Sequence, residues 1–182
     1  MRRLAIVCGL ALAASPAAAA EPTGEWVVAN GHAHVSIENC GGAYWGAISW
    51  EERPGGRDTE NPDPAKRNQP TLGLPILLDM TPTDPNRWEG HVYNAENGHT
   101  YSASITLRNP NTLHIEGCVL GFLCGGEDWS RLQPSEQAQE PRSRTRSSAP
   151  RTSGSGGKAT SSAKPNIDVC SRVSDVTGRG RR

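Results

Sequence analysis

The chain has 182 residues, of which 19 are acidic and 19 are basic. The formal net charge of zero conceals a division: residues 21–132 carry 15 acids and 7 bases (net −8), and residues 133–182 carry 4 acids and 10 bases (net +6). After residue 20 no apolar stretch approaches the ~20 residues of a membrane-spanning helix, which excludes an integral helical membrane protein.

The first 20 residues, MRRLAIVCGLALAASPAAAA, have the layout of a secretory signal peptide. Two arginines precede an apolar run, and Ala18-Ala19-Ala20 supplies small residues for cleavage before Glu21. The residues before Cys8 fit a lipoprotein signal poorly. We therefore expect an exported protein, periplasmic or secreted, that does not span the membrane.

Between residues 25 and 132 short β-type runs alternate with turn signals, without a helical period. The runs are 26–29, 32–38, 43–50, 72–80, 87–94, 100–107, 112–119 and 127–132. Asn30-Gly31 is a hairpin signal, and residues 51–70 form a long polar loop. Pro75 cannot donate a ladder hydrogen bond, which indicates an edge, bulged or bent strand.

The order of these runs predicts an all-β domain over residues 21–132. Sequential strands joined by short turns favour a single antiparallel up-and-down barrel of about eight strands, which hides its edges by closure. A two-sheet sandwich is the alternative. Residues 133–182 are rich in Ser, Pro, Gly and Arg, and we expect a disordered basic tail because so little apolar surface cannot offset the entropy of ordering.

Short motifs along this domain resemble a known family. They are Gly24-x-Trp26, Cys40-Gly41-Gly42, Asn61-Pro62-Asp63-Pro64, Leu72-Gly73-Leu74, Trp88-x-Gly90, Tyr93-Asn94, Glu96-Asn97-Gly98-x-Thr100-Tyr101 and Trp129-x-Arg131. In order and spacing they resemble the small exported bacterial proteins catalogued as domain of unknown function 2147, over residues 23–132. The resemblance implies a lipocalin-like (calycin) barrel with no established enzyme activity and no known catalytic residues. We expect no cofactor.

The resemblance also implies a structural pair. Gly24-x-Trp26 looks like the tryptophan motif that opens lipocalin barrels, in which a basic residue of the last strand lies across the indole. Arg131 is placed to do this, and such stacking contributes on the order of 0.5–2 kcal/mol. Members of the family often carry a second cysteine shortly after Cys40-Gly41-Gly42, where this chain has Trp45.

Six side chains of the predicted strands are candidates for the lining of a ligand cavity: Ile48, Trp50, Trp88, Val92, Tyr101 and Ile105. Packed core is the alternative for each, since an eight-stranded barrel is just wide enough to be filled or to hold one small ligand. The leading hypothesis is a binding module for a small hydrophobic molecule. The alternatives are a structural or interaction protein of the cell envelope and an enzyme with an unrecognised site.

No sequence pattern indicates catalytic or metal chemistry, so we expect neither an enzyme nor a metal site. His32 and His34 share a strand face and His91 and His99 flank a hairpin, but no zinc-site spacing accompanies them. The chain lacks a GxSxG motif. Its acids are expected to be solvated loop groups, namely Glu51, Glu52, Asp58, Asp63, Asp79 and Asp84.

Four cysteines remain after the signal peptide, and export favours their oxidation. In one extended strand, Cys118 and Cys124 would lie about 20 Å apart, beyond the ~7 Å that a disulfide allows. Gly121 lets the chain fold back, which favours a local bridge over pairing with Cys40. Cys40 is then free or paired with Cys170.

The basic tail suggests an anionic partner. Export and the absence of aromatic residues for base stacking argue against nucleic acid. An anionic component of the cell envelope fits the tail better than nucleic acid does, and a solvated extension without a partner is favoured over both.

Overall fold

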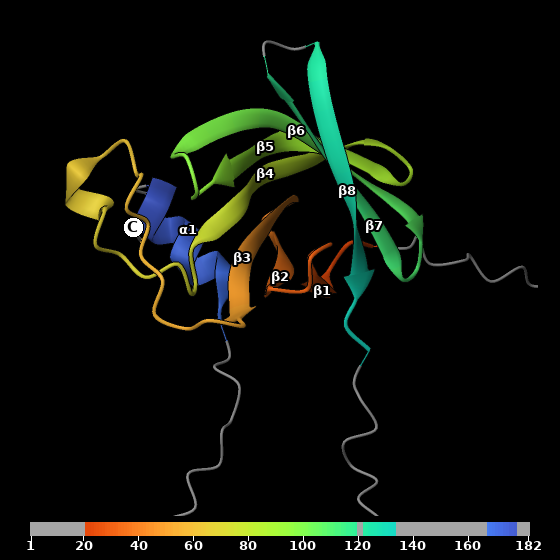
Figure 1. Ribbon diagram of the computed structural model, residues 1–182. Helices are drawn as coiled ribbons and strands as arrows, with labels where there is room; N and C mark the ends of the chain where they lie inside the picture. The colour runs from red at the N-terminus through yellow and green to blue at the C-terminus, as the bar shows by residue number, and fades with distance from the viewer. Residues whose placement is uncertain (1–20, 120–121, 134–166, 178–182) are drawn as a thin grey trace, which may run out of the picture.

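The computed structural model describes residues 21–119, 122–133 and 167–177. The predicted signal peptide lies outside the described residues, as does most of the predicted tail. Eight strands follow one another around the barrel, and one helix follows them (Figure 1). Their bounds are β1 Gly24–Val27, β2 Ala33–Cys40, β3 Ala43–Glu51, β4 Pro75–Asp84, β5 Arg87–Asn94, β6 His99–Asn109, β7 Thr112–Val119, β8 Leu123–Arg131 and α1 Val169–Thr177.

Each strand pairs antiparallel with the next, and β1 pairs with β8, so the sheet is a closed barrel. The prediction of an up-and-down barrel of about eight strands is confirmed, and the sandwich alternative is wrong. In such a meander the β1–β2, β3–β4, β5–β6 and β7–β8 connections share one end of the barrel. In the described residues no helix has the length and apolar character needed to cross a membrane.

Side chains of alternate residues fill the interior at the opposite end. Trp26, Val35, Ile105 and Leu113 are fully buried there, with Trp88 beside them. The alternating pattern of the sequence creates this core because residues i and i+2 of a strand share a face. One end of the barrel interior is therefore filled by side chains.

The barrel closes where Arg131 of β8 lies over Trp26 of β1, with the guanidinium carbon 4.2 Å from the ring centroid. Arg131 also donates hydrogen bonds to the carbonyl oxygens of Pro110, Thr23 and Glu21. Gly24 has φ +117°, and a Cβ at this position would lie 2.7 Å from Arg131 Nη1. The arginine thus takes the place that the resemblance implies, and the Gly-x-Trp motif leaves room for it.

Several strand boundaries differ from the predicted ones, and the starts of β8 and β4 differ for identifiable reasons. β8 begins at Leu123 rather than 127, because the pairing with β7 continues through Cys118 and Cys124, which lie directly opposite each other. These two cysteines form the local disulfide that the sequence favoured. β4 begins at Pro75, where the first position of a strand tolerates the missing donor.

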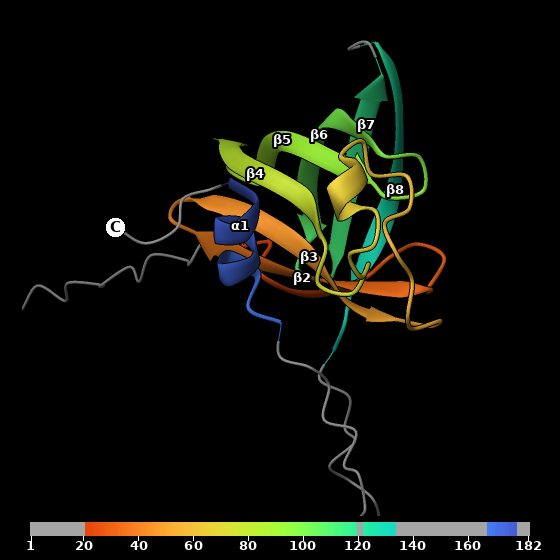
Figure 2. The ribbon, with the colours of Figure 1, turned by 90° about the vertical axis from the view of Figure 1, so that its left-hand side faces the viewer.

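The tail prediction is corrected for residues 167–177, which are ordered. Helix α1 lies against β2, β3 and β4 on the outside of the barrel (Figure 2). Ile167, Val169 and Val173 bury their side chains against Trp45 and Ala47. The prediction of disorder used the low average hydrophobicity of the whole tail and so missed these three apolar residues. Together they cover one apolar patch of the sheet.

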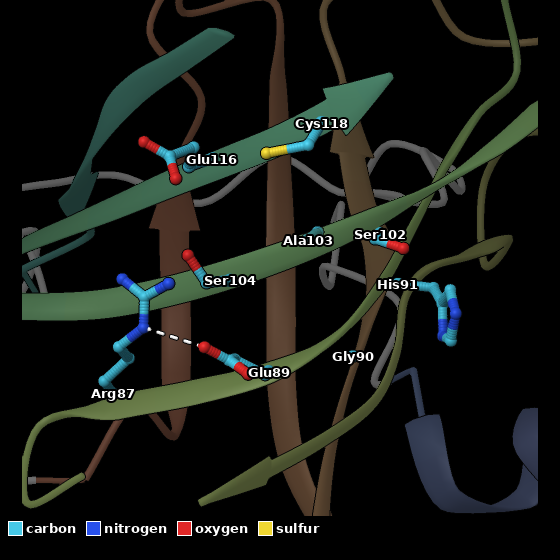
Figure 3. Close-up of a pocket in the computed structure, with 9 residues that line it drawn as sticks. All are labelled: Arg87, Glu89, Gly90, His91, Ser102, Ala103, Ser104, Glu116 and Cys118. Carbon is cyan, nitrogen blue, oxygen red and sulfur yellow. Dashed lines mark hydrogen bonds and ion pairs between the residues drawn. The ribbon is translucent and has the colours of Figure 1, made fainter. Parts of the chain in front are cut away.

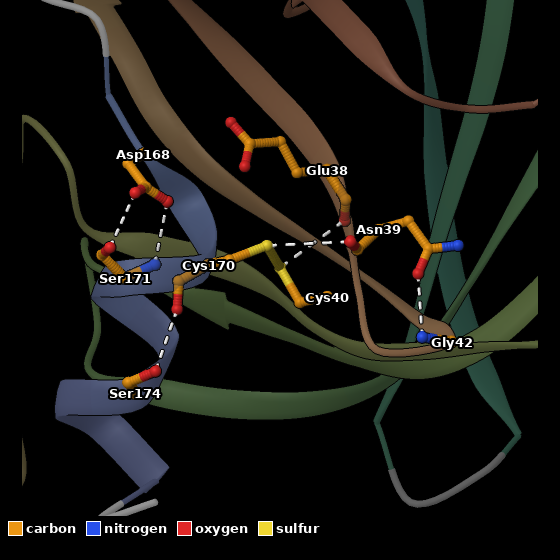
Figure 4. The surroundings of a disulfide bond; sticks show 8 residues. All are labelled: Glu38, Asn39, Cys40, Gly42, Asp168, Cys170, Ser171 and Ser174. Carbon is orange, nitrogen blue, oxygen red and sulfur yellow. Dashed lines mark hydrogen bonds between the residues drawn. A yellow bond between two sulfur atoms is a disulfide. The ribbon is translucent and has the colours of Figure 1, made fainter. Parts of the chain in front are cut away.

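A disulfide between Cys40 at the end of β2 and Cys170 in α1 fixes the helix (Figure 4). Of the two states that the sequence left open for Cys40, the structure shows the paired one. Asp168 accepts hydrogen bonds from the backbone N–H and hydroxyl of Ser171 at the start of the helix. These bonds hold its pKa below the usual value.

Replacing Arg131 tests the barrel closure. Arg131→Ala should lower the free energy of unfolding by about 2–3 kcal/mol, because it removes both the cation–π contact and hydrogen bonds. Arg131→Lys should recover only part of this loss, since an ammonium cannot reproduce the planar fork. Urea unfolding followed by tryptophan fluorescence measures both. Arg108→Ala, which breaks an exposed pair with Asp128, is the control and should change stability by less than about 1 kcal/mol.

Removing the disulfides separately tests their unequal contributions. The bridges span sequence separations of 130 and 6 residues. Chain-entropy arguments give about 5 kcal/mol for the long closure and about 2 kcal/mol for the short one. Cys40→Ser/Cys170→Ser should therefore destabilise more than Cys118→Ser/Cys124→Ser in the same urea experiment. Equal losses of unfolding free energy in the two variants would contradict the larger contribution of the Cys40–Cys170 bond.

Candidate functional site

A cavity of about 570 Å³ opens at the end of the barrel opposite the packed core. Its lining residues come from six strands, β3 to β8, and two turns: Val28, Asn30, Ile48, Ile76, Val92, Tyr93, Asn94, Ala95, Glu96, Tyr101, Ile115, Gly117, Gly125, Gly126, Glu127 and Trp129. Val28, Ile76 and Val92 also pack against the buried core. The cavity is therefore the unfilled continuation of the barrel interior.

Two glycines help to leave this space open. Gly117 of β7 and Gly125 of β8 lie directly opposite each other, and both line the cavity. A Cβ at Gly125 would meet no atom within 4 Å, whereas one at Gly117 would approach Val92 Cγ1 to 3.3 Å. A side chain at Gly125 would thus project into empty space.

The polar groups of the cavity lie in its wall and at its mouth. Glu127 precedes Trp129 by two residues in β8, and the indole Nε1–H donates a hydrogen bond to Glu127 Oε1. Glu96 stands in the β5–β6 turn at the mouth, with Asn94 beside it. The cavity is consequently apolar inside and carries carboxylates toward solvent.

The β3–β4 loop is fastened to this mouth through Tyr93. Asp58 of the loop is fully buried, which corrects the expectation that it is a solvated loop acid. Its carboxylate accepts hydrogen bonds from Tyr93 Oη (2.7 Å), Asn61 Nδ2 (2.6 Å) and Gln69 Nε2 (3.0 Å). Because a buried carboxylate must be satisfied, these donors fix the loop on the rim strand β5.

The β7–β8 hairpin projects beyond the neighbouring strands on one side of the mouth (Figure 1). Its side chains Val119, Phe122 and Leu123 are 43%, 77% and 67% exposed. A second hollow of about 390 Å³ runs from the cavity lining to Val119 and Leu123, so the apolar surface continues outward along the hairpin.

Three of the six predicted lining residues do line the cavity: Ile48, Val92 and Tyr101. Trp88 and Ile105 are buried in the core instead, because their strand positions lie deeper in the barrel. Trp50 is on the outer face and stacks on His34, with ring centroids 4.4 Å apart. Ile48 pairs with Val35 and Trp50 with His34, so Ser49 is an extra residue that reverses the facing of Trp50.

Sequence reasoning did not select Ile76, Ile115, Glu127 or Trp129 as cavity residues. A signal for two of them was available, since Glu127 and Trp129 alternate with outward residues on the strand that ends in Arg131. Ile115 lies opposite Glu127 in the β7–β8 register. Only the strand pairing shows which of these residues lie near the open end.

A polar groove of about 450 Å³ lies on the outer face of β5, β6 and β7 (Figure 3). Its side chains include His91, Ser102 and Glu116, and Arg87 forms an ion pair with Glu89 at 3.1 Å. The side chains that line this groove are polar or small. The barrel cavity is the better candidate because it is larger and its lining includes aliphatic and aromatic side chains from several strands.

The four histidines considered from the sequence, His32, His34, His91 and His99, do not come together in a group of potential metal ligands within the described residues. His32 pairs with Glu52 at 2.5 Å, His34 stacks on Trp50, and His99 lies beside Tyr101. Across the described part of the chain, one group of three potential ligands comes close together: Glu116, Cys118 and Cys124. Both sulfurs of this group belong to a disulfide and are not thiolate ligands.

The closed eight-stranded meander, its clamped tryptophan and its open-ended cavity define a lipocalin-like barrel. A solved structure described as "Protein HP1028 from the human pathogen Helicobacter pylori belongs to the lipocalin family" is similar, with a TM-score of 0.58 and 21% identity over 64% of this chain and 86% of that chain. No curated protein matches. Residues 24–131 match the family described as uncharacterised protein conserved in bacteria (DUF2147), and the chain belongs to this family.

The pKa of Tyr93 provides a test of the loop anchor. Burial, aided by the hydrogen bond to Asp58, raises the pKa of Tyr93 to about 12. Since the pKa of Tyr93 is higher in the folded state than the unfolded value of 10, the protonated tyrosine contributes fully to the free energy of unfolding below pH 10. This contribution is lost as the pH rises toward 12. Spectrophotometric titration should show a tyrosinate transition near pH 12 that Tyr93→Phe removes. Asp58→Asn should move this transition to lower pH, and an unmoved transition would contradict the anchor.

Proposed function

We propose that this protein is an exported binding protein that takes a small, predominantly apolar molecule into the open end of its barrel. The observation that carries this proposal is the cavity of about 570 Å³, whose lining includes aliphatic and aromatic side chains from several strands. Open apolar cavities in barrels of this size suit one small ligand, because burying the ligand's apolar surface provides the binding free energy.

The wall of the cavity supports a binding role over a catalytic one. Ile48, Ile76, Val92 and Ile115 offer only dispersion and hydrophobic contacts, and Tyr101 adds an aromatic face. The apolar strip along Val119 and Leu123 offers a path by which such a ligand reaches the cavity while remaining in contact with apolar surface.

Two further features support export as part of the proposal. The first 20 residues have the charge and apolar pattern of a signal peptide. Two disulfides join the four cysteines that follow it, and such bonds persist in oxidising compartments. Cell fractionation, with the mature amino terminus determined by mass spectrometry, tests this part of the proposal.

Binding can be tested with N-phenyl-1-naphthylamine, a neutral apolar fluorophore that brightens in apolar surroundings. The mature protein should bind it, and Gly125→Leu should weaken binding about tenfold or more, because the new side chain projects into the cavity from a position where a Cβ meets no atom within 4 Å. Ser102→Leu adds the same side chain on the exposed outer face of β6 and serves as the matched control.

The two variants separate cavity binding from surface adsorption. Equal fluorophore affinity in Gly125→Leu, Ser102→Leu and the unmodified protein would overturn the proposed function. Thermal unfolding of both variants shows whether the barrel remains folded, so that a loss of binding is not a loss of structure.

A further inference from the structure

The charge of the cavity points to the kind of ligand that it accepts. Its lining includes two carboxylates, Glu96 and Glu127, and no lysine, arginine or histidine among the described residues. Carboxylates near an apolar chamber repel an anionic head group and attract a cationic one. A fatty-acid-like ligand would place its own carboxylate against both acids.

Glu127 is held in position toward this chamber. It stands directly opposite Ile115, a cavity residue, and accepts the indole N–H of Trp129. The hydrogen bond uses one carboxylate oxygen and directs the group along the wall of the cavity. The charge is therefore presented from a paired strand rather than from a free loop.

Asp128, the next residue of β8, lies on the opposite face of the strand and differs from Glu127 in its ion pairs. Asp128 is paired with Arg108 Nη1 and His114 Nδ1, both at 2.7 Å. Within the described part of the chain, Glu127 forms no ion pair. Two consecutive carboxylates thus differ: among residues 21–119, 122–133 and 167–177 the outer one has basic partners and the inner one has none.

The positions of the apolar and acidic groups set the orientation of the ligand. Val28, Ile76 and Val92 continue into the core, whereas Glu96 stands at the mouth. An elongated molecule would gain most by placing its apolar part inward and its charged end beside the carboxylates, where water still reaches it. Full burial of the charge, which is costly, is then unnecessary.

We infer that the preferred ligand is an amphiphile with a cationic end, such as an alkyl or aryl amine, whose ammonium lies beside Glu127 and Glu96 while its apolar part fills the barrel. This inference rests on the proposed function, because it assigns the ligand class of the same cavity.

Three competitors with one chain length test the inference: decylammonium, 1-decanol and decanoate. Each is used to displace N-phenyl-1-naphthylamine from the mature protein at neutral pH and low ionic strength. Partly exposed ion pairs are worth only modest energies, so decylammonium should bind about three- to tenfold more tightly than decanol. Decanoate should bind more weakly than decanol, and added salt should reduce both differences.

Substitutions distinguish the cavity acids from the net negative charge of the barrel. Glu127→Gln keeps an oxygen that can accept the Trp129 hydrogen bond, and with Glu96→Gln it should bring decylammonium and decanol to within about twofold of each other. Glu38→Gln removes one negative charge from β2 outside the cavity lining and should leave the preference unchanged.

The outcomes separate the two claims. Failure of the fluorophore and of all three competitors to bind would overturn the proposed function and the inference together. Decanol binding with equal or weaker decylammonium binding would overturn the inference alone. An amine preference that survives Glu127→Gln/Glu96→Gln would also overturn it, because the bulk charge would then be its source.

Discussion

The barrel depends on the closure between β1 and β8. β1 has only four residues, and only Trp26 and Val27 pair with β8. So short a ladder supplies few backbone hydrogen bonds, and Arg131 compensates by stacking on the indole and bonding to three carbonyl oxygens of other segments. One side chain thus ties the chain entering the barrel to the strand that completes it.

The cavity follows from how side-chain volume is distributed along the closed barrel. At the clamped end Trp26 and Trp88 belong to the buried core and leave the interior packed. At the other end Gly117 faces Gly125 in neighbouring strands, where larger residues would fill the lumen. The same eight strands therefore form a packed core at one end of the barrel and an open cavity at the other. The positions of bulky and small residues within each strand determine which end is packed.

Much of the fold could be predicted because turn signals and period-2 alternation are local properties of the sequence. The depth of a residue in the barrel is not local. Ile105 alternates as Tyr101 does, yet only Tyr101 reaches the cavity, since the register of all neighbouring strands sets the depth. Trp50 faces outward because of one extra residue in β3. Asp58 is buried where it accepts a hydrogen bond from Tyr93, which is far from it in the sequence.

The Cys40–Cys170 bond also changes the covalent topology of the molecule. It joins the end of β2 to α1, so the backbone from β3 to the helix forms a closed ring. A single cut of the backbone between Gln133 and Ile167 opens that ring without separating the helix from the barrel. Proteolysis in this stretch would convert the protein into a two-chain molecule, and only reduction of the bond would then release the helical fragment.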